Sequence, residues 1–131
     1  MSQKDVEVLR TAYARATARG AEGMLEFATE DVVWISDPRF PGGGMHNGKE
    51  NVRRWLNQLW IYEEFSIDVE EIIDLDDNRA LGITHCHGVL PDAPDADWLW
   101  CHLVSFRDGL ISQAQSFLDR DGALEAAGLR D

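Results

Sequence analysis

The strongest constraint on the fold is one change in hydrophobic periodicity, which falls near Phe65. Before it, most apolar residues recur every three or four positions, as between Val6 and Ala16, and this spacing is typical of amphipathic helices. After it they alternate, which indicates strands. Helices followed by a run of strands predict an α+β domain. At 131 residues, without linkers or repeats, the chain is expected to form a single domain over residues 1–131.

The segments after Phe65 predict a bent, antiparallel sheet. The alternation shifts register at Glu70–Glu71, which predicts a bulge that bends the strand. Turn residues separate the strands that follow, so hairpins should connect them in series. In chain order we expect a helix ending at Gly20, a short helix through Met24–Phe27, a strand at 31–37, a helix through Val52–Trp60, strands from Phe65 and at 79–90, 97–106 and 110–118, and a closing helix at 121–128.

The charge balance excludes some partners. Twenty-four acidic residues against twelve Lys and Arg give a net charge of −12, so nucleic acid and anionic membrane surfaces should be repelled. Residues 1–5 lack a signal-peptide pattern, and no apolar run approaches the roughly 20 residues of a membrane span. We therefore expect a cytoplasmic protein. Cys86 and Cys101 fall within expected strands, which favours reduced core thiols over the alternative of a cross-strand disulfide.

Asp37 is the first candidate for a functional residue. An apolar strand, Val32–Ile35, runs into this acid and then into a loop rich in Pro and Gly. A carboxylate at a strand end, surrounded by aromatic residues, can be desolvated enough to act as a base near neutral pH. Asp before Pro is also a common turn opener whose carboxylate bonds the local backbone, so both roles remain open.

The order of elements resembles the cone-shaped α+β fold of the nuclear-transport-factor-like superfamily, a cystatin-like architecture. In it a curved antiparallel sheet wraps around N-terminal helices and encloses a pocket. The resemblance covers nearly the whole chain. Three segments are most similar to SnoaL-like proteins and their relative ketosteroid isomerase: residues 32–37, the Gly-rich loop before His46–Glu50, and Leu103–Gly109. The superfamily includes enzymes of several classes and non-catalytic members, so function depends on the pocket.

The resemblance to ketosteroid isomerase implies roles for three residues. That enzyme uses a tyrosine on its first helix and an aspartate base at the end of its first strand, and Tyr13 and Asp37 occupy similar positions. Asp37 would take a proton from a carbon next to a carbonyl, while Tyr13 would donate a hydrogen bond to the enolate oxygen. His102 replaces the isomerase's protonated acid and can donate one hydrogen bond when neutral. This departure argues against steroid isomerisation itself.

Other relatives match less well. SnoaL-like cyclases carry an acidic base on the last strand, where this chain has Gln113 and Gln115. Limonene-epoxide hydrolase relatives need an Asp-Arg-Asp set inside the pocket, and here only Arg39 next to Asp37 suggests one.

Strand alternation predicts which side chains line the pocket. A lining of aromatic rings with a few polar groups suits a flat, mostly apolar ligand. The expected substrate-binding residues are Trp98, Trp100, Phe106, Gln113, Gln115, Phe117 and Arg39. His85 and His87 share a strand face and would form a zinc site if His102 joined them, but the spacing is weak, so neither metal nor cofactor is expected.

Together these patterns predict a cofactor-independent acid/base enzyme of isomerase, cyclase or lyase type, acting on a small apolar carbonyl compound with Asp37 as base. One alternative is a non-catalytic small-molecule-binding or scaffold protein of the same fold, and another is an epoxide or ester hydrolase. The resemblance also implies a homodimer formed through the outer face of the sheet.

Overall fold

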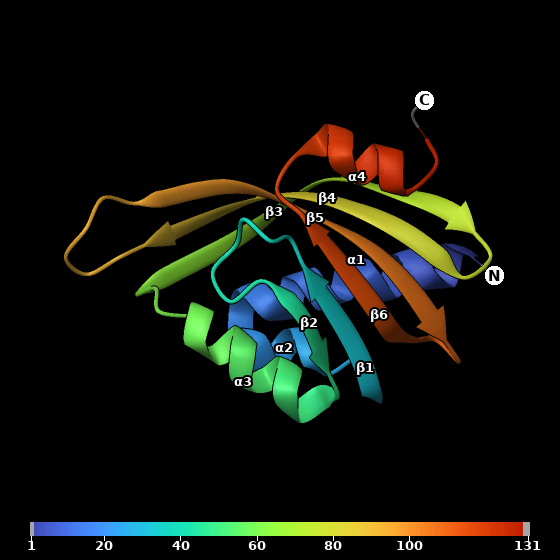
Figure 1. Ribbon diagram of the computed structural model, residues 1–131, viewed down its shortest axis with the longest axis horizontal. Coiled ribbons are helices and arrows are strands. Elements are labelled where there is room, and N and C mark those ends of the chain that lie inside the picture. Colours follow the sequence, from blue (N-terminus) through green and yellow to red (C-terminus); the bar gives the residue numbers. More distant parts are fainter. Residues whose placement is uncertain (1, 130–131) are drawn as a thin grey trace.

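The computed structural model describes residues 2–129, which form four helices and six strands (Figure 1). The helices are α1 (Ser2–Arg19), α2 (Ala21–Leu25), α3 (Lys49–Leu59) and α4 (Arg120–Ala126). The strands are β1 (Ala28–Ser36), β2 (Gly44–Asn47), β3 (Glu64–Asp76), β4 (Arg79–Val89), β5 (Ala96–Arg107) and β6 (Leu110–Phe117). Figure 1 shows α1, α2 and α3 gathered on one side of a curved sheet and α4 on the other. The expected α+β cone is confirmed.

The sheet is unclosed, and its strand order is β2-β1-β6-β5-β4-β3. β3 to β6 form the antiparallel meander that the turn residues predict. β1 joins this meander by pairing parallel to β6, and the short β2 adds an antiparallel edge. The sequence did not reveal β2, because four residues are too few to show an alternation.

Two of the register shifts in the sheet bear on which side chains face the core. The first lies between Val69 and Glu71 of β3 and confirms the predicted bulge. The second lies opposite Ser105–Phe106, where β6 carries one extra residue between Ile111 and Gln113. A bulge reverses which side chains face the core beyond it, so this second shift decides which part of β6 faces inward.

A hydrophobic core occupies each face of the sheet. The larger core lies between the concave face and the first three helices, and the smaller one lies between the other face and α4. Cys86 belongs to the inner core and Cys101 to the outer core, and both are free. Reduced thiols are therefore confirmed and the disulfide alternative is wrong, because the two side chains lie on opposite faces. Burial raises the pKa of Cys86 to about 12 and that of Cys101 to about 11.

Helix ends follow local chemistry. Gly20 has a φ of 69°, a conformation that favours glycine, and α1 ends just before it, as expected. The cap of α4 is Asp119, whose carboxylate accepts a hydrogen bond from the Gly122 N–H at 2.7 Å. The helix therefore begins one residue earlier than the pattern starting at Asp121 predicts. Within residues 2–129, no helix combines the length and apolarity needed to cross a membrane.

Candidate functional site

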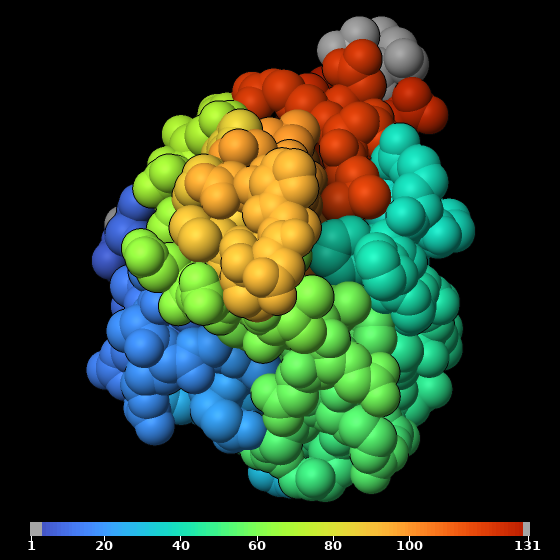
Figure 2. Space-filling view, turned by 90° about the vertical axis from the view of Figure 1, so that its left-hand side faces the viewer, coloured from blue at the N-terminus to red at the C-terminus, as the bar shows by residue number. Residues whose placement is uncertain are grey.

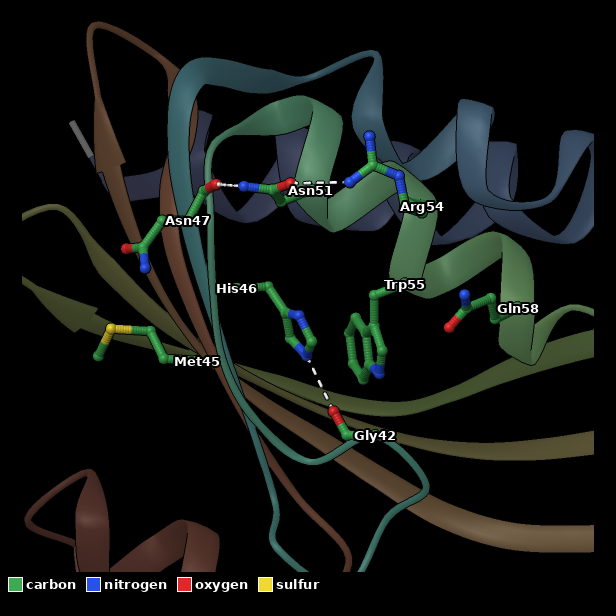
Figure 3. Close-up of a pocket in the computed structure, with 8 residues that line it drawn as sticks. All are labelled: Gly42, Met45, His46, Asn47, Asn51, Arg54, Trp55 and Gln58. Atoms are coloured by element: carbon green, nitrogen blue, oxygen red, sulfur yellow. Dashed lines mark hydrogen bonds between the residues drawn. The ribbon is translucent and has the colours of Figure 1, made fainter.

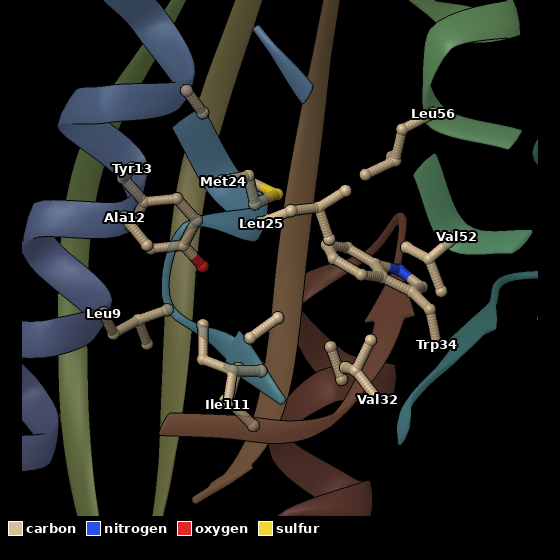
Figure 4. Packing of buried hydrophobic residues seen from close by; sticks show 14 of the residues in the cluster. Leu9, Ala12, Tyr13, Met24, Leu25, Val32, Trp34, Val52, Leu56 and Ile111 are labelled. Atoms are coloured by element: carbon tan, nitrogen blue, oxygen red, sulfur yellow. The ribbon is translucent and has the colours of Figure 1, made fainter. Parts of the chain in front are cut away.

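A tyrosine and a histidine meet in the inner core. Tyr13 comes from the face of α1 that packs on the sheet, and His102 comes from the inward face of β5. The Tyr13 Oη and the His102 Nδ1 lie 2.8 Å apart, and each residue is only 1% exposed. In Figure 4 the Tyr13 hydroxyl points away from α1, among the buried apolar side chains. The two predicted polarising residues thus form a single hydrogen-bonded pair.

Gly82 of β4 makes this meeting possible. A Cβ atom at this position would lie 2.2 Å from the Tyr13 Oη, well inside the contact distance. Glycine within a strand often marks such a close approach, so the sequence does carry a signal for this contact.

Burial keeps both members of the pair neutral. It lowers the pKa of His102 to about 3, and it raises the pKa of Tyr13 well above its ordinary value. If the tyrosine hydroxyl donates to Nδ1, the proton of the neutral imidazole sits on Nε2. The other tautomer leaves a free Tyr13 hydroxyl and a lone pair on Nε2. No residue within the range 2–129 is bonded to this Nε2.

Two small cavities lie inside the cone, each of about 10 Å³. The first adjoins the Tyr13–His102 pair, and its other lining residues are Leu9, Ala12, Met24, Trp34, Val104, Ile111 and Ala114. The second is lined by Phe40, Leu56, Leu59, Trp60, Tyr62, Phe65, Trp98 and Trp100. A space of roughly this volume holds about one water molecule. A larger ligand must therefore displace side chains.

Aromatic rings separate the cavities and close one end of the interior. Phe40, from the loop after β1, stacks on Trp100 with ring centres 5.8 Å apart. Trp98 lies 5.7 Å from Tyr62 and 5.9 Å from Phe65, again between ring centres. Figure 2 shows this end of the molecule, where the β4–β5 hairpin in yellow and orange lies over the green segment that follows α3. Inward positions of Trp98 and Trp100 agree with the predicted alternation.

Asp37 has surroundings different from those that the sequence suggested. It is 6% exposed, yet its carboxylate accepts four hydrogen bonds: from the Arg39 N–H, Nε and Nη2 at 2.9, 2.9 and 2.7 Å, and from the Leu118 N–H at 3.1 Å. These bonds, first of all those from the Arg39 side chain, hold the pKa of Asp37 well below its usual range despite burial. The expected rise in the Asp37 pKa is therefore wrong, because these hydrogen bonds together outweigh desolvation.

This ion pair lies outside both cavities. The Arg39 side chain is 58% exposed and also bonds the Asp119 carboxylate at 2.7 Å. Asp37 thus joins the end of β1 to the segment after β6, and it fixes the base of the loop that carries Phe40. The expected contact of Arg39 with a substrate inside the cone finds no support, since Arg39 lines neither cavity.

The predicted wall on β6 is wrong in part. Gln113, Gln115 and Phe117 pair with Ser105, Leu103 and Cys101, whose side chains face away from the cone. The bulge in β6 is the reason, because it shifts the alternation by one residue. Ala114 and Ser116 take the inward positions instead, and the Ser116 Oγ accepts a hydrogen bond from the Trp34 Nε1–H at 2.6 Å. The expected inward position of Phe106 is confirmed, in the inner core.

The histidines do not converge. His85 and His87 lie on the outer face of β4 and contact Asp95 and Asp97, with the His87 Nδ1 2.8 Å from the Asp97 Oδ1. His102 lies on the inner face, so the sheet separates it from them. No three or more His, Cys, Asp or Glu side chains among residues 2–129 are arranged to hold a metal ion.

A wider groove lies on the outer surface beside α3 (Figure 3). It measures about 340 Å³, and in it the His46 ring stacks on Trp55 with centres 4.5 Å apart. The His46 Nε2 is 2.9 Å from the Gly42 carbonyl oxygen. None of the predicted site residues lines this groove.

Comparison with known proteins shows which family the chain belongs to. The model of the SnoaL-like domain family matches residues 9–114. No curated protein matches the sequence.

Solved structures share the fold at low sequence identity. TerC co-crystallised with polyporic acid has a TM-score of 0.75 and 19% identity, over 95% of this chain and 98% of that chain. A Catenulispora acidiphila protein with a ketosteroid isomerase-like fold, in complex with trimethylamine, has a TM-score of 0.73 and 15% identity, over 94% and 93%. An LEH-like epoxide hydrolase of M. tuberculosis has a TM-score of 0.71 and 11% identity, over 95% and 90%. The family match over most of the chain and this shared fold make the protein a SnoaL-like member of the nuclear-transport-factor-like superfamily.

Proposed function

We propose that this protein is a cofactor-independent acid/base enzyme of isomerase, cyclase or lyase type. Its substrate is a small, flat, mostly apolar carbonyl compound that binds inside the cone. The observation that carries this proposal is the buried Tyr13–His102 pair: the His102 Nε2 has no hydrogen-bond partner among residues 2–129, and it lies beside a cavity with otherwise apolar lining. Buried polar groups are normally satisfied, so an unsatisfied one next to a cavity is expected to meet a ligand.

The pair supplies an electrophile for a carbonyl oxygen. With the Tyr13 hydroxyl donating to Nδ1, the Nε2–H of His102 is free to donate to the substrate oxygen. As a proton leaves the carbon next to the carbonyl, negative charge develops on that oxygen and strengthens the hydrogen bond. A neutral imidazole can fill this role, because it keeps one N–H donor, and the pKa of about 3 leaves His102 uncharged at neutral pH.

Two groups can act as the proton acceptor. Asp37 was the predicted base, and in this geometry it must first release Arg39 before it accepts a proton. The Nε2 of His102 is the other acceptor, in the tautomer that leaves the Tyr13 hydroxyl free to polarise the substrate, and its pKa of about 3 makes it a weak base. Replacement of Asp37 by Asn separates them, since only the first assignment makes the carboxylate essential.

The test is hydrogen exchange rather than a guessed product. NMR would follow deuterium incorporation next to the carbonyl in a panel of enones and of aromatic ketones that carry a C–H beside the carbonyl. His102→Gln and Tyr13→Phe should each slow exchange about 100-fold, the usual effect of removing one oxyanion donor. His46→Gln is the matched control, because His46 lies in the outer groove and should leave the rate unchanged.

Equal exchange in wild type and His102→Gln would contradict the proposal. Tight binding of panel compounds with no exchange in any of them would favour the alternative, a non-catalytic small-molecule-binding protein. Hydrolysis is supported less well. The structure does join Asp37, Arg39 and Asp119, but the side chains of Arg39 and Asp119 are 58% and 48% exposed and line neither cavity.

A further inference from the structure

Three unpartnered nitrogens follow one another along the inward face of β5. They are the Trp98 Nε1, the Trp100 Nε1 and the His102 Nε2, and each is buried. Among residues 2–129, five buried side-chain polar atoms lack a hydrogen-bond partner, and three of the five form this row. Such atoms are rare in folded proteins, so their concentration on one strand calls for a physical reason.

Two other indoles in the same core show the ordinary situation. The Trp34 Nε1–H donates to the Ser116 Oγ at 2.6 Å, and the Trp55 Nε1–H donates to the Pro41 carbonyl at 3.2 Å. The fold therefore satisfies these two tryptophan N–H groups with protein acceptors. The N–H groups of Trp98 and Trp100 have no such acceptor within the described part of the chain, and the neighbours of both indoles include aromatic rings.

The row spans both cavities. Residues two apart on a strand lie roughly 6.5 Å apart on the same face, so the three side chains cover about 13 Å. His102 lines the first cavity, and Trp98 and Trp100 line the second. Phe40 stacks on Trp100 and also lines the second cavity, so its withdrawal would enlarge the space beside Trp100.

We propose that this row donates hydrogen bonds to oxygen atoms of the ligand, with Trp98 and Trp100 as specificity-determining donors. An indole nitrogen can only donate, so each requires an acceptor. The site therefore selects a flat molecule that carries at least two oxygen acceptors spaced along its frame, rather than a hydrocarbon with a single carbonyl. This inference rests on the proposed function for the location of the pocket, and it adds the class of ligand.

A matched pair of probes tests the selectivity. 2,3-Dimethyl-1,4-naphthoquinone and 2,3-dimethylnaphthalene share their rings and methyl groups and differ in two carbonyl oxygens. Calorimetry should show tighter binding of the quinone to the wild type. Trp98→Phe and Trp100→Phe keep an aromatic ring but remove the N–H, so each should lower the ratio of the two affinities about tenfold.

Trp55→Phe is the control. It removes an N–H that already has a protein acceptor, the Pro41 carbonyl, at a residue that lines neither cavity, so the ratio of the two affinities should stay unchanged. A quinone that binds no tighter than the hydrocarbon would overturn the inference. An unchanged ratio in both the Trp98 and Trp100 variants would also overturn it.

Indole N–H proton NMR gives a second readout without mutation of the row. In the free protein the Trp98 and Trp100 protons should resonate upfield of the bonded Trp34 proton, and the quinone should move them downfield. If the Trp98 and Trp100 protons already had the chemical shift of a hydrogen-bonded indole before ligand is added, the premise that these donors are unpartnered would be refuted.

The affinity ratio needs no turnover, so it separates this inference from the proposed function. If Tyr13→Phe exchanges substrate hydrogen as fast as wild type while the tryptophan variants change the ratio, only the proposed function fails. If Tyr13→Phe abolishes exchange while Trp98→Phe and Trp100→Phe leave the ratio of the two affinities unchanged, only the inference about the donor row fails.

Discussion

Replacement of Asp37 by Asn tests whether this residue supports the fold or the chemistry. The carboxylate is almost fully buried, and its two oxygens accept four hydrogen bonds, three of them from Arg39. An Asn side chain keeps one oxygen, which can still face the Arg39 N–H and Nε. Its amide NH₂ then faces the Arg39 Nη2 and the Leu118 N–H, which are donors themselves.

The expected cost follows from that mismatch. Two charge-assisted hydrogen bonds are lost, each with a net contribution of about 1.5–3 kcal/mol in favourable cases. The Arg39 side chain is more than half exposed, so water takes over part of its solvation and reduces the loss. We therefore expect the free energy of unfolding to fall by about 2 kcal/mol, which is below the roughly 3–5 kcal/mol for breaking a fully buried pair.

Urea unfolding followed by tryptophan fluorescence would measure this loss at pH 7. The pKa of Asp37 is lowered in the folded state, so its contribution is present above the unfolded pKa of about 3.9 and is lost as the pH falls below it. The difference between wild type and Asp37→Asn should shrink accordingly below pH 4. Asp31→Asn is the control, because the Asp31–Arg107 pair lies on the surface and should contribute little.

Unchanged stability of Asp37→Asn at pH 7 would refute this reasoning. If that result came with complete loss of hydrogen exchange in a substrate, Asp37 would be the base that the sequence predicts rather than a structural anchor.

Three further predictions concern the pair, its packing and the assembly. In the wild type, the free energy of unfolding should fall by about 1.4 kcal/mol per pH unit below pH 6.5, because His102 binds a proton in the unfolded chain but not when buried with its pKa of about 3. His102→Gln should remove this pH dependence. Unfolding of both proteins at pH 6.5 and 5 would measure it, and equal slopes would contradict the prediction. Gly82→Ala should destabilise the fold by about 1–3 kcal/mol, because the new methyl meets the Tyr13 hydroxyl, and Tyr13→Phe in the same chain should recover part of the loss in thermal denaturation. We also expect a homodimer, for which light scattering should give twice the chain mass; the chain mass itself would rule it out.

Local patterns predicted most of the fold. The alternation from Phe65 onward, its shift at Glu70–Glu71 and the turn residues between strands act over a few neighbouring residues, and the structure confirms the bent antiparallel meander that they imply. The family model confirms the family that the order of elements suggested. These features are visible in the sequence because hydrophobic periodicity sets the period of each element.

The candidate site depended on contacts that no local pattern contains. Tyr13 and His102 were both expected to polarise the substrate oxygen, but only packing showed that they bond each other across 89 residues of sequence. One extra residue in β6 turned Gln113 and Gln115 away from the cone. The sequence by itself determined which residues could be buried. The tertiary structure decided what each buried group meets, and for Asp37 a guanidinium rather than an apolar wall sets the direction of its pKa.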